Sequence, residues 1–144
     1  MDFVSQEKRT KIMKSIKSSD TKPEIILRKF LFNNGLRYKI NYKGLSGKPD
    51  IVFVSRKLAI FVHGCFWHQH DDNCGITNKP ASNKRFWSDK FKKNMERDKR
   101  NIKEIETMGW RTLTIWECQI LDKNRKPRDI SRILKEIKKK LFSN

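Results

Sequence analysis

A chain of 144 residues with 36% hydrophobic residues is long enough for one folded domain and too apolar for an intrinsically disordered protein. Its 34 Lys and Arg against 16 Asp and Glu give a net charge of +18, which favours a polyanionic partner: nucleic acid first, an anionic membrane surface second. No apolar run could span a bilayer, no signal peptide is recognisable, and three cysteines suit a reducing compartment, so we expect a cytoplasmic protein that is not inserted in a membrane.

The chain begins with a basic segment. Residues 5–17 mix Lys and Arg with a few apolar side chains and predict a basic helix or arm. We therefore divide the chain into an N-terminal arm over residues 1–20 and a single domain over residues 21–144. No repeat or linker interrupts the second part, and nothing suggests more than a monomer.

A helix start signal opens the domain. Thr21 is placed as the N-cap, Pro23 falls in the first turn, and Glu24 lies three residues after the cap as in a capping box. Gly35 is expected to end this helix. Glu24 has two interpretations, since a capping-box glutamate needs no further role.

The remaining elements predict an α/β fold. Residues 37–42, 49–55 and 57–62 are β-prone, and the last two segments are nearly all apolar, as in strands buried on both faces. A long helix over about residues 83–108, a strand over residues 111–116 and a basic amphipathic helix over about residues 127–142 follow. The order α-α-β-β-β-α-β-α predicts a mixed sheet flanked by helices.

Residues 62–74 concentrate potential metal ligands, with all three histidines and two of the three cysteines. Cys65, His70 and Cys74 are nitrogen and sulfur ligands of the kind that tetrahedral zinc prefers. Cys118 could be the fourth ligand if strand 111–116 lies beside strand 57–62. The set predicts a structural Cys3His zinc site. The alternative is that Cys65 and Cys118 are small buried residues and that His70 is a solvated loop residue.

Two further histidines suggest phosphodiester chemistry. His63 directly follows a buried strand and His68 lies in the same loop, while Asp50 opens the adjacent strand. A proline–aspartate pair before an apolar strand resembles the start of a metal-dependent nuclease pattern. The usual carboxylate-x-lysine of the next strand is absent, because Phe61 and Val62 precede His63. Asp50 could still hold Mg²⁺ if a backbone carbonyl and waters complete the octahedron, with the histidines acting on metal-bound water or the leaving group.

The long helix carries a carboxylate on its apolar stripe. The apolar members of the stripe are Phe91, Met95, Ile102 and Ile105. Asp98 falls among them, and a core-facing carboxylate needs a partner, for which His63 or His68 is the candidate. The alternative is that Asp98 belongs to a solvated charge run and forms an ion pair within the helix.

Aromatic residues beside basic ones are the last candidates. Phe66 and Trp67 lie among polar loop residues, and Trp87 follows Phe86 at the start of the long helix. One interpretation places these rings in the core, where most aromatic residues lie. The other uses them to stack on bases or to wedge into a duplex.

Together these motifs resemble the very-short-patch (Vsr-type) DNA mismatch repair endonucleases of bacteria, over about residues 9–118. The matching motifs are R-x3-M-x2-I (9–16), D-T-x2-E (20–24), G-x-P-D (47–50), H-G-C-F-W-H (63–68), F-W (86–87), K-N-x-E-R-D (93–98), G-W-R (109–111) and W-E-C (116–118). The resemblance implies a restriction-endonuclease-like fold and a Mg²⁺-dependent nick 5′ to the thymine of a T·G mismatch in double-stranded DNA. It also implies a functional pairing with a cytosine-5 methyltransferase, because such mismatches arise by deamination of 5-methylcytosine.

The resemblance also implies residue roles by position. Mg²⁺ falls on the Asp50 carboxylate and the Val62 carbonyl, with His63, His68 and Asp98 as catalytic residues and Glu24 as a supporting acid. Zn²⁺ falls on Cys65, His70, Cys74 and Cys118. The DNA contacts implied are the wedge residues Phe66, Trp67 and Trp87, the mismatch readers Lys90 and Asn94, and Met13 and Ile16 in the arm. Val62 replaces a family threonine, and the gap between His70 and Cys74 is longer than in the family.

Three other functions stay open from the residues. A restriction-type endonuclease would cut unmismatched DNA on both strands, although a matched duplex resists an aromatic wedge. A zinc-stabilised DNA-binding protein without activity would make no use of Asp50, His63, His68 and Asp98. A membrane-surface protein has only the basic helix over residues 127–142 in its favour.

Overall fold

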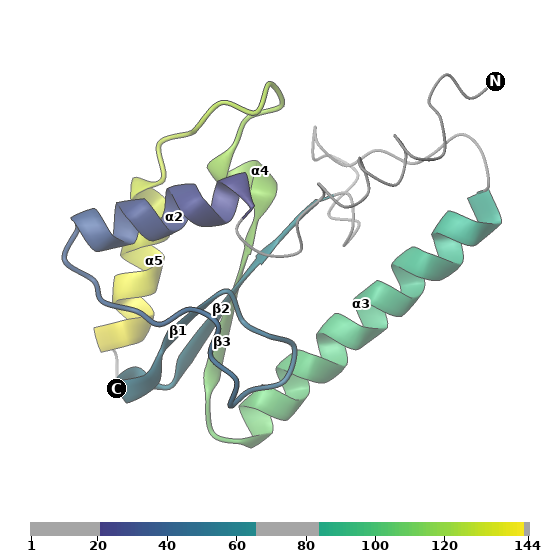
Figure 1. Cartoon of the computed structure of the whole chain (residues 1–144), viewed down its shortest axis with the longest axis horizontal. Coiled ribbons are helices and arrows are strands. Elements are labelled where there is room, and N and C mark those ends of the chain that lie inside the picture. Colours follow the sequence, from purple (N-terminus) through teal and green to yellow (C-terminus); the bar gives the residue numbers. More distant parts are fainter. Residues whose placement is uncertain (1–20, 66–83, 143–144) are drawn as a thin grey trace.

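The computed structural model describes residues 21–65 and 84–142 (Figure 1). Over these residues the elements are α2 (Lys22–Asn33), β1 (Ile51–Phe53), the 3-10 turn η1 (Val54–Arg56), β2 (Leu58–His63), α3 (Lys84–Thr107), β3 (Arg111–Trp116), α4 (Glu117–Ile120) and α5 (Ser131–Phe142). The predicted arm with Met13 and Ile16, and the loop residues Phe66, Trp67, His68, His70 and Cys74, lie outside the described residues.

The described strands form the predicted mixed sheet, in the order β1-β2-β3. β1 and β2 form an antiparallel hairpin through η1, with Ile51 opposite Ile60. β2 and β3 are parallel over their whole length, and His63 is opposite Trp116. The expected neighbourhood of strands 57–62 and 111–116 is therefore confirmed. All residues of β1 and β2 are buried, as their apolar sequences indicated.

Helices cover both faces of this sheet (Figure 1). On one face, Leu58, Ile60 and Val62 of β2 pack with the apolar stripes of α2 and α5 in the main hydrophobic core. On the other face, Ala59 and Phe61 pack with Ile105 of α3. Because side chains alternate along a strand, β2 directs successive residues to the two different layers.

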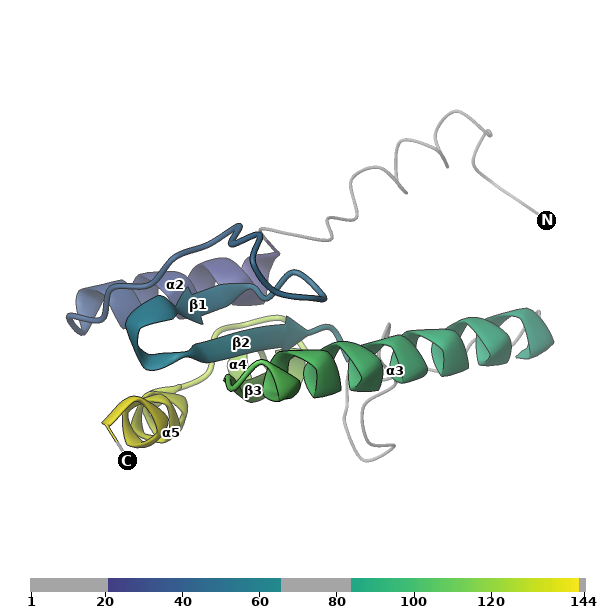
Figure 2. The same ribbon diagram turned by 90° about the horizontal axis from the view of Figure 1, so that it is seen from below.

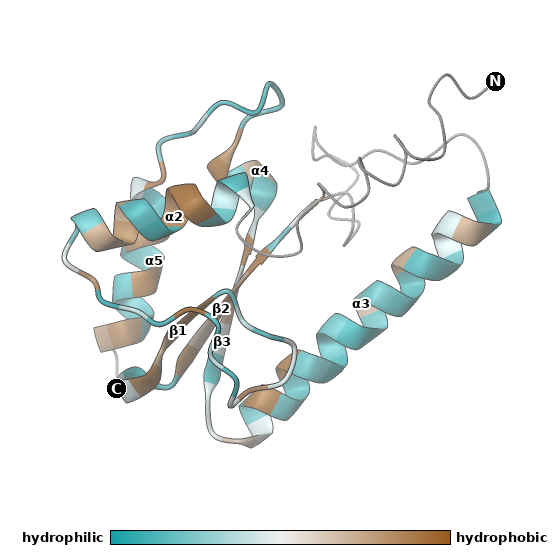
Figure 3. Cartoon of the chain, in the orientation of Figure 1, coloured by the Kyte–Doolittle hydropathy of each residue, from teal (hydrophilic) through white to brown (hydrophobic). Residues whose placement is uncertain are grey.

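The long helix α3 is only partly attached to the sheet. Figures 1 and 2 show its first turns extending beyond the ends of the strands, and Figure 3 shows that its surface is mostly hydrophilic. Phe91 and Ile105 are buried, but Met95 is 41% exposed, so the prediction that Met95 belongs to a core-facing stripe is wrong. The described helices include none that is long and apolar enough to cross a membrane.

Residues 37–42 do not form the predicted strand. The segment makes one isolated antiparallel bridge, in which Lys39 and Val52 exchange backbone hydrogen bonds of 2.8 and 2.9 Å. Beyond Lys39 the chain leaves the sheet: Ile40 is 40% exposed and Asn41 has a left-handed φ of 56°. Tyr42 then packs against Trp110 on the α3 side, with ring centroids 5.9 Å apart. The apolar residues of this segment thus serve two separate layers rather than one strand face.

The start of α2 is correct but its capping box is wrong. Thr21 is the N-cap with extended backbone angles, yet its side chain makes no capping hydrogen bond. Glu24 instead turns inward and is only 2% exposed. Gly35 ends the helix with φ 84°, where a residue with a Cβ atom is disfavoured.

The last helix begins later than predicted. Pro127 bridges to Leu121 and the Arg128 amide donates to the Ile120 carbonyl at 2.8 Å, so residues 127–130 continue an extended connection. α5 starts at Ser131, whose amide donates to the Asp129 side chain at 3.0 Å. Its apolar side is buried and its basic side is exposed, as expected of a helix packed on the sheet. The short helix α4 was not predicted.

Candidate active site

Asp50 and Val62 lie together at one end of the sheet. β1 and β2 are antiparallel, so the residue that precedes β1 lies beside the last residues of β2. The Asp50 amide donates to the Ile60 carbonyl at 2.9 Å, and the Val62 amide donates to Asp50 Oδ2 at 2.6 Å. The Asp50 carboxylate is therefore held against the backbone of Val62, the residue whose carbonyl is its expected co-ligand.

The first turn of α2 places Glu24 at the same end. Its carboxylate accepts a 2.6 Å charged hydrogen bond from Arg28, one helical turn later. Burial above all, together with the charge and hydrogen bond of Glu24, raises the pKa of Asp50 to about 8, against the lowering effects of the Val62 amide and Arg28. Both carboxyl groups thus share one buried, polar end of the sheet. Glu24 is structurally part of this site, which its capping interpretation did not include.

This environment suits a hard divalent cation. A cation beside Asp50 would favour the charged carboxylate that burial disfavours. Carboxylate and carbonyl oxygens are the ligands that Mg²⁺ takes in proteins, with waters completing its octahedron. No group of three or more His, Cys, Asp or Glu residues able to hold a metal ion occurs within residues 21–65 and 84–142. The donors here that fit Mg²⁺ are the Asp50 carboxylate and the Val62 carbonyl, with the Glu24 carboxylate nearby as a supporting acid.

His63 lies next to this pair but on the other face of the sheet. Its side chain alternates with Val62, is buried, and contacts the rings of Phe61 and Trp116 at centroid distances of 5.7 and 5.3 Å. The Trp116 contact is edge-to-face, at 78°. These rings limit the orientations of the imidazole. The predicted position of His63 at the end of a buried strand is confirmed.

Asp98 approaches the same end from α3. Its side chain is 16% exposed, and its ion pair with the neighbouring Arg97 is long, at 3.9 Å. Ile105 of α3 and Ala59 of β2 belong to the same apolar cluster. From Ile105 back to Asp98 the helix rises about 10 Å, and from Ala59 on to His63 the strand rises about 13 Å, so the two lengths are similar. Asp98 therefore lies at roughly the level of His63, which agrees with its place on the stripe. Its pairing with a histidine stays a prediction.

The described part of the zinc set comes from adjacent strand ends. Cys65 and Cys118 each lie two residues beyond the paired residues His63 and Trp116 of β2 and β3. The Cys65 amide donates to Glu117 Oε1 at 3.3 Å, so the two segments touch directly. Cys65 is buried, as the alternative interpretation expected, whereas Cys118 is only partly buried. His70 and Cys74 are outside the described residues, and the zinc site stays a prediction.

The predicted DNA contacts on α3 share one stretch of helix. The Trp87 ring stacks on Phe91 with centroids 5.7 Å apart and meets Phe86 edge-to-face at 5.4 Å. Lys90 Nζ lies 6.0 Å from the centre of the Trp87 ring. Phe86 is 60% exposed and Asn94 is half-buried, one turn after Lys90. Rings and cations therefore lie together on the projecting part of α3.

Sequence reasoning missed three charged residues around the site. Arg28 binds Glu24 and could have been found from their spacing of one helical turn. Glu117 lies inside the W-E-C motif, but only the cysteine of this motif was assigned a role from the sequence. Arg125, which binds Glu117 at 2.9 Å, comes from an irregular loop and has no local sequence signal.

The mixed α/β fold has a neighbour among solved structures. It is similar to the solved structure described as "Homing Endonuclease I-Bth0305I Catalytic Domain", with a TM-score of 0.53 and 22% sequence identity. The match covers 84% of this chain and 94% of that one. Likeness at this level of identity concerns the fold alone.

Closer relatives place the chain in a family. Residues 1–74 match the family described as DNA mismatch endonuclease Vsr. "Type II nicking enzyme V.NmeAIP" of Neisseria meningitidis serogroup A is 43% identical over 137 residues, covering 95% of this chain and 96% of that protein. "DNA mismatch endonuclease Vsr" of Escherichia coli K12 is 39% identical over 119 residues, covering 83% of this chain and 75% of that protein. The chain belongs to the Vsr family and is a DNA endonuclease.

Proposed function

We propose that this endonuclease nicks double-stranded DNA 5′ to the thymine of T·G mismatches that arise by deamination of 5-methylcytosine. The single observation that carries the catalytic part is the contact between the Asp50 carboxylate and the Val62 backbone beside buried Glu24. The mismatch specificity is supported by the similarity to relatives described as a DNA mismatch endonuclease and a type II nicking enzyme. Its functional partner is then a cytosine-5 methyltransferase.

In this proposal Asp50 and the Val62 carbonyl hold Mg²⁺, with Glu24 as the supporting acid. When bound, the cation supplies Lewis-acid stabilisation of charge on the scissile phosphate. His63 takes the proton of the attacking water at an imidazole nitrogen, and the hydroxyl of the broken strand leaves with a proton from His68. Asp98 orients one of these rings and stabilises its charged form. The contacts of His63 with Phe61 and Trp116 keep the ring from swinging away from the phosphate.

Structural Zn²⁺ held by Cys65, His70, Cys74 and Cys118 forms the second metal site of the proposal. The parallel pairing of β2 and β3 supports it, because Cys65 and Cys118 leave the sheet side by side. Elemental analysis of purified protein is expected to give about one equivalent of zinc. Zinc-free protein that is folded and active would remove this part of the proposal.

In this proposal the enzyme selects the mismatch because the DNA duplex is easier to deform there. Phe66, Trp67 and Trp87 enter the duplex, while Lys90 and Asn94 read the T·G pair and Met13 and Ile16 add contacts from the arm. Unstacking costs a few kcal/mol and costs less where pairing is already weak, so a wobble pair is favoured over a matched one. The net charge of +18 holds the backbone, and affinity should fall steeply with salt.

A nicking assay with Mg²⁺ on matched duplexes tests the proposal. One duplex carries T·G, its control carries T·A, and both are labelled on each strand. We expect cleavage of the thymine strand of the T·G duplex alone. Equal cutting of both duplexes, or breaks in both strands, would instead establish the restriction-type activity. A panel of T·G duplexes with varied neighbours then defines the sequence context.

A further inference from the structure

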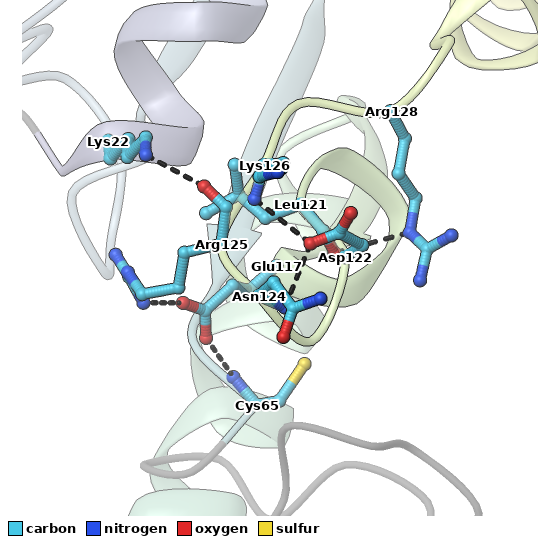
Figure 4. Close-up of polar contacts among 9 residues, drawn as sticks. All are labelled: Lys22, Cys65, Glu117, Leu121, Asp122, Asn124, Arg125, Lys126 and Arg128. Carbon is cyan, nitrogen blue, oxygen red and sulfur yellow. Dashed lines mark hydrogen bonds and ion pairs between the residues drawn. The ribbon is translucent and has the colours of Figure 1, made fainter.

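A second polar cluster lies beyond the ends of β2 and β3, centred on the buried carboxylate of Glu117 (Figure 4). Glu117 Oε1 accepts the Cys65 amide at 3.3 Å, and Oε2 accepts Arg125 Nη1 at 2.9 Å. The two carboxylate oxygens therefore join two segments more than fifty residues apart in the chain: the end of β2 and the loop that follows α4. The proposed reaction assigns no role to Glu117 or Arg125.

The same loop reaches the first turn of α2. Lys22 Nζ donates to the Arg125 carbonyl at 2.7 Å, two residues from Glu24 in the chain. Arg128 Nε donates to the Cys118 carbonyl at 2.9 Å. The loop after α4 thus contacts α2 through Lys22 and α4 through Arg128. It contacts the end of β2 indirectly, because Arg125 pairs with Glu117 and Glu117 accepts the Cys65 amide. All three segments carry residues of the candidate site.

Arg125 occupies an unfavourable backbone conformation to do this. Its φ is 61°, in the left-handed region that glycine adopts more readily than any other residue. The turn around it is fixed by Asp122, whose side chain accepts the amides of Asn124 and Lys126 at 2.8 and 3.0 Å. Glycine would fit this turn with less strain, but it has no guanidinium to bind Glu117. The presence of an arginine at position 125 is therefore explained by the ion pair of its side chain with Glu117, and not by the backbone conformation of the turn.

We propose that Glu117 is a positioning residue: paired with Arg125, it fixes the backbone at Cys65 and so sets the end of β2, with Val62 and His63, against α2 and α4. Val62 and His63 are within three residues of the anchored amide, and a strand end held at that point cannot fray. The effect of this anchor on catalysis rests on the proposed function. Small misplacement of reacting groups is costly in rate, so the anchor should act on kcat.

Amide hydrogen exchange at Cys65 tests the anchor without activity. In Glu117→Ala, we expect the Cys65 amide to exchange at least tenfold faster than in the wild type, while the amide of Ile60 in the middle of β2 is unchanged. Glu117→Gln keeps an oxygen for Cys65 but loses the pairing with Arg125, and its exchange should be intermediate. Unchanged exchange at Cys65 in both variants would overturn the proposal. The matched control is Glu136→Ala, which removes an exposed carboxylate of α5.

Kinetics on the T·G duplex test the consequence. Glu117→Ala and Arg125→Met should lower kcat by about tenfold or more and change KM by less than twofold. Arg125→Lys keeps a cation and should recover most of kcat, whereas Arg125→Gly relaxes the backbone and should stay as slow as Arg125→Met. Wild-type kcat in Arg125→Gly, or an effect confined to KM, would overturn the proposal. If the wild type itself does not nick T·G, the proposed function fails while exchange at Cys65 still decides the anchor.

Discussion

The Val62 amide donates a 2.6 Å hydrogen bond to the carboxylate of Asp50, twelve residues earlier in the chain. This bond crosses the open end of the β1–β2 hairpin and fixes the direction of the Asp50 side chain. The Asp50 carboxylate and the Val62 backbone thus lie side by side at this end of the sheet. The second strand does not supply the acidic side chain that metal-dependent nucleases usually have there. The hydrogen bond also gives Asp50 a structural role that substitutions must preserve.

Asp50→Asn is expected to abolish most of the nicking activity with little loss of fold. The amide oxygen of Asn can still accept the Val62 amide, but it carries no charge to hold a divalent cation. Removal of one group that stabilises charge in a transition state costs on the order of 10²–10³-fold in rate. Single-turnover nicking and thermal unfolding are measured together, with Glu136→Gln on α5 as the control. Activity within tenfold of the wild type would remove Asp50 from the mechanism.

The stability of the metal-free protein should fall as pH rises from about 4 to about 8. The pKa of Asp50 is raised from 3.8 to about 8, chiefly by burial, so the folded state retains a proton that the unfolded state has lost. The stabilisation is complete below the unfolded pKa and is lost as pH rises through the folded one. The slope from one proton is at most about 1.4 kcal/mol per pH unit.

Denaturant titrations with a chelator present, repeated in Asp50→Asn, measure this slope. The difference between the two proteins isolates Asp50 from the other ionisable groups. Adding Mg²⁺ should reduce the loss at high pH, because a bound cation favours the charged carboxylate. A difference curve that is flat with pH would contradict the assignment of a raised pKa to Asp50.

Gly47→Ala should disturb the loop that leads into Asp50. Gly47 has φ 78°, and a Cβ atom added there would lie 2.9 Å from both Cβ and Nδ2 of Asn101 on α3. Left-handed strain and overpacking each cost about 1–2 kcal/mol. Gly35→Ala is the matched control, because Gly35 has φ 84° and open space around it. Both variants add left-handed backbone strain, but only Gly47→Ala adds a close contact with Asn101, so the difference between their free energies of unfolding measures that contact. Equal losses of stability would mean that the close approach of Gly47 to α3 is unimportant.

Trp87→Ala should weaken binding to T·G duplexes more than binding to T·A duplexes. Loss of one base–aromatic stack costs about 1–3 kcal/mol, and a wedge acts only where the duplex opens. Fluorescence anisotropy at one fixed salt concentration compares the four complexes. Phe32→Ala, which removes a 53% exposed ring from α2, is the control for a general loss of aromatic surface. Equal weakening on both duplexes would favour a general binding role for Trp87.

Strong local patterns in the sequence predicted most of the fold. β2 is a nearly continuous apolar run, β3 alternates threonine with apolar residues, and α3 and α5 have the spacing of helices, so these elements were predictable. Residues 37–42 have a β-prone composition, but the left-handed Asn41 and the packing of Tyr42 on Trp110 divide them between two layers. Such a division depends on tertiary contacts that no local pattern records.

The residues of the candidate site likewise divide into those with a local sequence signal and those that depend on tertiary contacts. Asp50 and His63 were found because both flank apolar strands, and a strand end is a recognisable place in a sequence. Glu24 had two interpretations, a capping-box residue or a supporting acid, because its spacing from Thr21 fits a capping box; in the structure it is buried beside Asp50 instead. Arg125 could not be found at all, since its link to Glu117 depends on how an irregular loop folds back on the sheet.

The central position of β2 makes its residue count critical. Val62 faces the α2 layer, while His63 lies on the face of Phe61 and α3. A register slip of one residue in this strand would exchange the two faces. The proposed metal ligand and the proposed proton acceptor would then both point away from their partners. Insertions or deletions should therefore be tolerated in the irregular stretch over residues 37–46 far better than between Leu58 and Cys65, where a single added residue would inactivate an otherwise folded enzyme.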